Sequence, residues 1–279
     1  MSALFIKILA IVFMLADHIG YSIGSSGFAS IDFGDGYYFL RAIGRLSLPL
    51  FAFLIANGFR HTRSVPKYAM RLFAFAIISE IPFDLFVSGK ITLVTMNGIL
   101  PDIHLDNIFF TLLIGLVFLW LNDFYKKRQI KYAKLLSVAT FIFLSFFAAF
   151  ISADYGVTGV GFVALFGVFN VEDKNKIPML FVGFSVLAYW KLIARSILVV
   201  VYRSFRINLV RIPIISHLFS GYNPIMALIQ TAALLSLAFI LFYNQKSGMP
   251  KSRVANAVLK YSFYVFYPVH LLILYFAFG

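Results

Sequence analysis

Long apolar stretches fill most of this chain, and short polar linkers separate them. The stretches 8–16, 141–151 and 232–242 contain no charged residue. A helix that crosses a bilayer needs about 20 mostly apolar residues. Stretches of this kind begin near Ala3, Phe39, Tyr68, Asn107, Leu135, Gly156, Ile177, Pro224 and Lys260. The pattern predicts an all-α fold, a polytopic membrane helix bundle with about nine spans.

The composition excludes a soluble domain. Of the 279 residues, 61% are hydrophobic and 13% are charged, whereas soluble domains carry about 25% charged residues. The strands of a transmembrane β-barrel would alternate apolar and polar residues over about ten positions, and these stretches do not. We find no internal repeat and no cleavable leader, so we expect one membrane domain over residues 1–279 with an uncleaved first span.

The net charge of +13 does not indicate nucleic-acid binding. The basic residues gather in linkers between apolar stretches, where such residues set the topology and contact lipid headgroups. The chain also has no cysteine. Disulfides, thiolate metal sites and a cysteine acyl-enzyme are therefore excluded.

The charged linkers predict an orientation. Basic residues gather after the second, fourth and eighth spans: Arg60, Arg63, Lys67, Arg71, Lys126, Lys127, Arg128, Lys131, Lys134, Lys246, Lys251, Arg253 and Lys260. The alternate linkers hold mostly acids: Asp32, Asp35, Asp84, Asp102, Asp106 and Asp154. Because basic loops tend to stay in the cytoplasm, we expect the N-terminus there.

One basic stretch does not fit this topology. It would lie near the outer face, and it contains Lys191, Arg195, Arg203, Arg206 and Arg211. Either the span count is wrong in this region, or the stretch is a basic amphipathic segment that binds an anionic substrate or lipid.

Three polar residues on the first helix mark a candidate site of chemistry: Lys7, Asp17 and His18. Ionisable groups inside a bilayer are expensive, so each is a candidate for function. Lys7 and His18 lie 11 residues apart, which places them on one helix face about 16 Å apart along the axis. Such a line suits a long cofactor whose anionic end stops at Lys7 and whose reactive end lies near His18.

His18 is suited to move a proton near neutral pH as a general base. Asp17 is a second catalytic candidate because it would raise the basicity of His18, although adjacent helical residues point about 100° apart. The alternative is structural: the two residues end the span at the outer interface, and His18 bonds to a neighbouring helix.

Arginines follow on the second span. Arg41 and Arg45 share one face at i,i+4 spacing, and each needs an anion, either Asp17 or a ligand phosphate or carboxylate. Arg60 and Arg63, at the end of this span, would clamp a phosphate or simply set the topology.

Three further residues are candidates. Glu80 and Asp84 flank Pro82 in the third span; either would pair with an arginine, and Glu80 would alternatively accept a proton. His270, after Pro268, is a second catalytic histidine or a structural one. The chain has no Gly-rich phosphate loop, HExxH motif or GxSxG elbow.

Several blocks of the sequence resemble the TraX family of bacterial membrane acyltransferases. They lie at residues 6–20, 41–54, 58–63, 67–72, 79–84, 154–156 and 263–271. The resemblance implies acetylation of the N-terminal amine of a conjugative pilin, with acetyl-CoA as donor. The fold also looks similar to a wider superfamily of transmembrane acyltransferases that modify surface sugars. Its members carry a basic residue and a histidine with ten residues between them, as Lys7 and His18 have, and an arginine pair with two residues between, which Arg60 and Arg63 could represent.

The resemblance leads to one main expectation, a multi-pass acyltransferase of the bacterial cytoplasmic membrane that needs no metal. The nucleotide of acetyl-CoA would bind near Lys7, Arg60, Arg63 and Arg71. His18 would deprotonate the acceptor, a pilin-like protein N-terminus or a glycan hydroxyl, and Arg45 would stabilise the oxyanion.

Two other functions compete with this one. Buried ionisable groups are equally typical of an ion-coupled transporter or lipid flippase, although the chain lacks inverted repeats. A scaffold of a secretion or conjugation complex is the third possibility.

Overall fold

A computed structural model describes residues 1–25, 36–92, 94–97, 100–171, 173–209, 215, 225 and 229–278. The α-helices are α1 (Ala3–Ser25), α2 (Gly36–Gly44), α3 (Ser47–His61), α4 (Val65–Ser88), α5 (Ile108–Lys127), α6 (Ala133–Phe150), α7 (Gly156–Val168), α8 (Ile177–Phe205), α11 (Ser236–Leu241) and α12 (Arg253–Phe278). The described residues also form two short 3-10 helices, η2 (Lys174–Lys176) and η4 (Gln230–Leu235). One antiparallel hairpin, β1 (Val94–Asn97) with β2 (Leu100–Ile103), interrupts the helical fold in the described residues.

Six helical segments of the described chain are long and apolar enough to cross a membrane, which makes this a multi-pass membrane protein. They are Ala3–Gly24, Gly36–His61, Ile108–Lys127, Ala133–Phe150, Lys174–Phe205 and Arg253–Phe278. Gly156–Val168 and Gln230–Leu241 are apolar but shorter. α4 has 24 residues and four charged side chains, and it is not among the six.

The all-α fold is therefore confirmed for the described residues, with six candidate spans. The orientation and the total of nine spans stay predictions. Asp32, Asp35, Arg211 and Pro224, which entered the span and topology predictions, lie outside the described residues.

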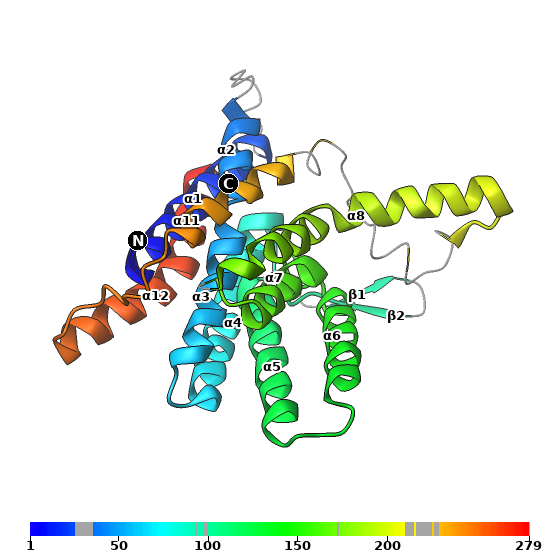
Figure 1. Ribbon diagram of the computed structural model, residues 1–279. Coiled ribbons are helices and arrows are strands. Elements are labelled where there is room, and N and C mark those ends of the chain that lie inside the picture. Colours follow the sequence, from blue (N-terminus) through cyan, green and yellow to red (C-terminus); the bar gives the residue numbers. More distant parts are fainter. Residues whose placement is uncertain are drawn as a thin grey trace.

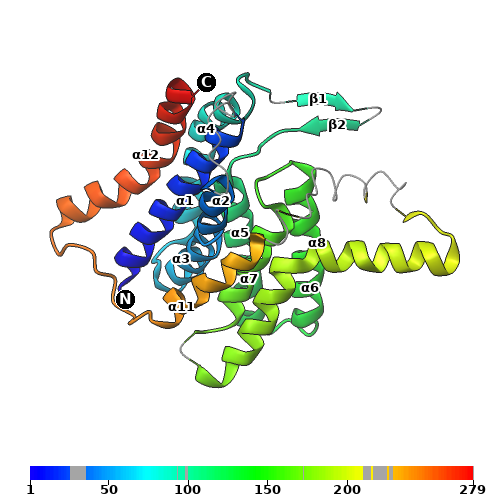
Figure 2. The ribbon, with the colours of Figure 1, turned by 90° about the horizontal axis from the view of Figure 1, so that it is seen from above.

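Five helices form a closed ring. α1 packs on α3 and α12, α4 packs on α12 and α5, and α3 also contacts α5. Figure 1 shows α3, α4 and α5 side by side, and Figure 2 shows α12 next to α1 at one edge, with α6 and α8 at the opposite edge. This ring encloses the cavity described below.

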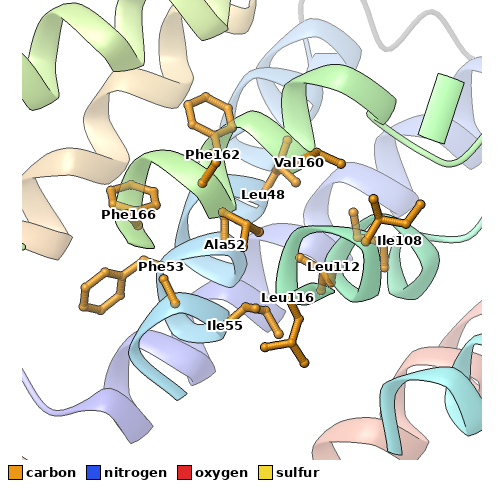
Figure 3. Close-up of a cluster of buried hydrophobic side chains, with 14 of the residues drawn as sticks. Leu48, Ala52, Phe53, Ile55, Ile108, Leu112, Leu116, Val160, Phe162 and Phe166 are labelled. Atoms are coloured by element: carbon orange, nitrogen blue, oxygen red, sulfur yellow. The ribbon is translucent and has the colours of Figure 1, made fainter. Parts of the chain in front are cut away.

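α7 is a short buried helix that fills the space between α3 and α5. Phe162 and Phe166 of α7 are fully buried, as is Phe53 of α3, and Figure 3 shows them in one cluster with Leu48 of α3 and Leu116 of α5. A Cβ at Gly159 would lie 2.3 Å from Thr111 Cγ2. Small residues of this kind let membrane helices approach closely, so α7 is held tightly against α5.

The second half of α8 leaves the bundle. α8 has 29 residues, about 44 Å at 1.5 Å per residue, which is longer than the roughly 30 Å hydrocarbon core. Both views show its distal half projecting sideways, away from α3–α7. Lys191, Arg195 and Arg203 lie on this helix, so the basic stretch that did not fit the predicted topology is mainly helical.

Candidate functional site

The five-helix ring encloses a cavity of about 460 Å³, here called the main cavity. This volume falls in the roughly 300–1,000 Å³ range of ligand sites. Its walls come from α1, α3, α4, α5 and α12, and they are mostly apolar. The polar side chains lie mainly near the beginnings of α1, α4 and α12 and the end of α3.

Three basic side chains line the main cavity: Lys7 of α1, Arg71 of α4 and Lys260 of α12. We call them the cation cluster. The positive charges of Arg71 and Lys260 both act on Lys7. Among the described residues that line the main cavity there is no carboxylate. The positive charge of the cluster is therefore available to an anionic ligand.

Aromatic rings support the cation cluster. Lys7 Nζ lies 4.8 Å from the centre of the Phe263 ring. Arg71 Nε donates a hydrogen bond to Tyr264 Oη at 3.3 Å, and its guanidinium lies 5.2 Å from the Tyr68 ring centre. Cation–π contacts of this kind hold a basic group in an apolar wall without neutralising it.

A second, much smaller cavity adjoins the main cavity. This small pocket measures about 20 Å³, and its lining includes Asp17, His18, Asp154 and Tyr155. Four residues line both spaces: Met14, Phe51, Ile108 and Tyr267. About one water-sized group fits in such a volume. The face of α1 thus runs from Lys7 in the main cavity to His18 in the small pocket.

His18 pairs with the second histidine candidate. His18 Nδ1 lies 2.7 Å from His270 Nε2, and the two rings are nearly coplanar, with an interplanar angle of 7°. His270 Nδ1 lies 2.9 Å from the Phe266 carbonyl oxygen. Because a carbonyl only accepts, His270 carries its proton on Nδ1.

The tautomer of His18 follows from this contact when both rings are neutral. His270 Nε2 then has no proton and accepts from His18 Nδ1–H. His18 Nε2 is left with a free lone pair. The pair therefore presents His18 as a proton acceptor, and His270 stabilises the imidazolium that would form.

Asp17 pairs with Arg41. A partner of this kind, either Asp17 or a ligand anion, was expected for Arg41 from the sequence. Arg41 Nη1 donates to Asp17 Oδ2 at 2.8 Å, and both side chains are largely buried. Asp17 Oδ1 is buried and has no hydrogen-bond partner among the described residues. A Cβ on Gly44 would lie 2.4 Å from this oxygen, so only glycine leaves room for Asp17 here.

Arg45 binds the turn between α6 and α7. Its Nη1 donates to Tyr155 Oη at 3.0 Å, and Asp17 and Asp154 both attract it. Burial raises the pKa of Asp154 to about 7, and the nearby Asp17 carboxylate adds to this, while Arg45 and Arg41 oppose it. Burial therefore favours the neutral form of Asp154.

The structure does not bring Arg60 and Arg63 to the main cavity. Arg60 Nη2 donates to the Phe166 carbonyl, and to the Gly167 and Phe169 carbonyls at 3.4 and 3.3 Å. A basic side chain in this position satisfies carbonyls at the C-terminus of a helix, here α7. Arg63 is exposed.

The two acids of α4 hold the linker that precedes α5. Glu80 Oε1 accepts from the Asp106 amide at 3.0 Å, and Glu80 Oε2 accepts from Asn107 Nδ2. Asp84 Oδ2 accepts from the Thr92 amide at 2.7 Å. Neither acid lines the main cavity or the small pocket.

Sequence reasoning missed several residues of the two cavities, among them Lys260, Tyr155 and Tyr267. Lys260 was taken as a topology residue because it begins an apolar stretch. The tyrosines belong to blocks that resemble the TraX family, and this was the available signal. Uncharged hydroxyls on apolar segments gave no other indication.

The comparisons with known proteins point to one family. The sequence profile of the family described as TraX protein matches residues 2–277. The chain is 28% identical over 279 residues to a protein of Dichelobacter nodosus named "Probable fimbrial assembly protein FimC, serogroup H1". The match covers 98% of this chain and 94% of that protein. No solved structure matches the chain.

Proposed function

Because the chain belongs to the TraX family, we propose that it is a membrane-embedded acyltransferase that moves an acetyl group from acetyl-CoA to an amine or hydroxyl. The family resemblance makes the N-terminus of a pilin-like protein the first acceptor to consider, and a surface glycan the second. The name of the Dichelobacter nodosus relative, which refers to fimbrial assembly, favours the protein acceptor.

One observation carries the proposal: the main cavity joins the cation cluster to the pocket that holds His18. Coenzyme A carries phosphates at one end and a thiol at the other, joined by a long, flexible arm. The phosphates match Lys7, Arg71 and Lys260, which have no acidic neighbour among the described cavity residues. The mostly apolar wall suits the arm, and the thioester would reach the shared lining beside His18.

The chemistry would fall to the two histidines. His18 Nε2 takes the proton of the acceptor amine or hydroxyl as the acceptor attacks the thioester carbonyl carbon. His270 Nε2 accepts a hydrogen bond from the resulting imidazolium, as it does from neutral His18. His18 then returns the proton to the departing thiolate. Direct transfer of this kind needs no acyl-enzyme, and the chain has no cysteine to form one.

The linker charges favour a cytoplasmic entrance. The cation cluster lies at the beginnings of α1, α4 and α12, and basic linkers precede α4 and α12. With those linkers in the cytoplasm, acetyl-CoA would enter from its own compartment. We therefore propose that the protein lies in the cytoplasmic membrane of a bacterium.

The test is acetyl transfer by the purified protein in lipid nanodiscs. We expect CoA thiol release from acetyl-CoA to rise when a peptide with a free N-terminal amine is added, and not with the same peptide already N-acetylated. His18→Ala should lower kcat by about 10²–10⁴-fold and leave CoA binding intact. Full transfer by His18→Ala would refute the mechanism. If acetyl-CoA neither reacts nor raises the melting temperature, the protein is better explained as a transporter of another solute.

A further inference from the structure

Two tyrosine hydroxyls of the small pocket are not used by the reaction described above. Tyr155 lies in the turn between α6 and α7, and Tyr267 lies on α12, where it is 3% exposed. Both side chains line the small pocket together with His18, and Tyr267 also lines the main cavity. Tyr267 therefore stands where the main cavity meets the small pocket, and Tyr155 lies in the wall of the small pocket.

The Tyr155 hydroxyl contacts a guanidinium, which donates hydrogen bonds but cannot accept one. Arg45 Nη1 donates to its oxygen at 3.0 Å, and the guanidinium lies 5.8 Å from the ring centre. A guanidinium has no acceptor atom, so the hydroxyl hydrogen of Tyr155 is directed elsewhere. The positive charge behind the oxygen also makes this hydroxyl a stronger donor.

The backbone of Tyr155 is held in an unusual conformation. Its φ is 59°, in the left-handed region that a bulky residue rarely adopts. The turn is fixed by the Asp154 amide, which donates to the Asp106 carbonyl at 2.8 Å, and by Thr111 Oγ1, which donates to the Asp154 carbonyl. Strain of this kind persists where the surrounding structure enforces it, and it gathers at functional sites.

The Tyr267 hydroxyl is also short of an acceptor. Its oxygen is buried and makes no hydrogen bond of acceptable geometry with the described residues. The backbone amide of Ile108 acts on it, but an amide is again a donor. Buried polar groups nearly always find partners. Among the residues that the structure describes, neither hydroxyl hydrogen has an acceptor, which indicates that an oxygen atom of a ligand belongs in the small pocket.

The charges of the pocket tolerate an anion at this point. Two arginines, Arg41 and Arg45, stand against the carboxylates of Asp17 and Asp154. When Asp154 is protonated, which its raised pKa of about 7 permits near neutrality, these four side chains carry a net charge of +1. A single developing negative charge would balance it.

We propose that the hydroxyls of Tyr155 and Tyr267 form the oxyanion site for the thioester carbonyl. This inference rests on the proposed acyl transfer. As the acceptor nitrogen or oxygen bonds to the carbonyl carbon, its proton passes to His18 and the C=O electron pair moves onto the oxygen, which accepts from both hydroxyls. The C–S bond then breaks, the C=O bond re-forms, and the thiolate takes the proton from His18. The volume of about 20 Å³ suits one such oxygen.

The experiment removes each hydroxyl alone. Tyr155→Phe keeps the ring over Arg45, and Tyr267→Phe keeps the shape of the shared wall. We expect each to lower kcat by roughly 10²–10³-fold, the usual loss for one oxyanion donor, with KM for acetyl-CoA and stabilisation by CoA nearly unchanged. Tyr125→Phe is the matched control, because its hydroxyl bonds to Thr140 at 3.1 Å between α5 and α6, and it should keep full kcat.

A spectroscopic readout separates a direct contact from a structural role. With His18→Ala to prevent turnover, the infrared band of ¹³C=O-labelled acetyl-CoA should lie at lower frequency when bound, and should return toward its solution value in each tyrosine variant. If both tyrosine variants keep full kcat and the shifted band, the oxyanion site is refuted while acyl transfer stands. If the wild type neither binds nor turns over acetyl-CoA, the proposed function fails instead.

Discussion

The basic residues of the main cavity and those beside the small pocket have different charged neighbours. Lys7, Arg71 and Lys260 line a wall in which no described residue is acidic. Arg41 and Arg45, beside the small pocket, face Asp17 and Asp154.

This difference separates binding from chemistry. Charge that the protein leaves unmatched is available to a ligand, and it repels itself until the ligand arrives. Charge that the protein matches internally fixes side chains in place and keeps the local field defined for a proton transfer. The cation cluster is therefore suited to hold phosphates, and the small pocket to orient His18 and the reacting carbonyl.

The largest effect on stability is expected from breaking the buried ion pair between Asp17 and Arg41. Asp17→Asn leaves Arg41 without its charge partner in a buried site, and loss of one member of a buried ion pair lowers the free energy of unfolding by about 3–5 kcal/mol. Thermal unfolding in detergent measures this.

The control is the exposed ion pair Lys127–Asp123, whose atoms lie 2.7 Å apart. Asp123→Asn should change stability by at most about 1 kcal/mol. The double variant Asp17→Asn/Arg41→Met should recover part of the loss. An Asp17→Asn protein as stable as wild type would mean that the Asp17–Arg41 pair does not stabilise the fold, which would contradict the contrast with the cation cluster.

An intermediate effect, on the affinity for CoA, is expected from removing a charge of the cation cluster. Lys7→Met removes a charge-assisted contact worth about 1.5–3 kcal/mol to a bound phosphate, so the Kd for CoA should rise at least tenfold. The stability of the free protein should stay the same or rise, because Lys7 has only repulsive charged neighbours in the described cavity wall.

Isothermal titration with CoA and thermal unfolding without it give the two readouts. Lys131→Met, an exposed lysine of the α5–α6 linker, is the matched control and should change neither. A Lys7→Met protein that unfolds more easily but binds CoA normally would contradict the assignment.

The smallest effect concerns pH. The folded pKa of Asp154 is about 7 against an ordinary value of 3.8, so between these values the folded state holds a proton that the unfolded state has released. Stability from this group is present at low pH and is lost as the pH rises through about 7. The slope is at most about 1.4 kcal/mol per pH unit.

Comparison with Asp154→Asn isolates this contribution. The melting temperature of the wild type should fall more steeply between pH 5 and pH 7 than that of the variant. Parallel curves would show that Asp154 ionises normally.

Sequence reasoning could predict those features of the candidate site that lie on one helix or on two neighbouring helices. Helical periodicity alone placed Lys7 and His18 on one face. The cost of buried charge predicted a partner for each arginine of the second span, and Arg41 bonds Asp17. Long apolar stretches were enough to predict an all-α protein with several membrane helices.

Contacts between distant segments could not be read from the sequence. The pairing of His18 with His270 joins residues 252 positions apart. The spacing of Arg60 and Arg63 is compatible with a phosphate clamp, yet the packing of α7 brings its terminal carbonyls to Arg60. α7 itself has 13 residues, although its apolar stretch predicted a full span.

The central claim is that one cavity carries coenzyme A from the cation cluster to His18. A density map of the protein in nanodiscs with CoA tests it most directly. We predict the phosphates within about 4 Å of Lys7, Arg71 and Lys260, and the sulfur beside His18 where the main cavity meets the small pocket. CoA bound outside the helix ring, for example at Arg60 and Arg63, or a sulfur far from His18, would contradict the account.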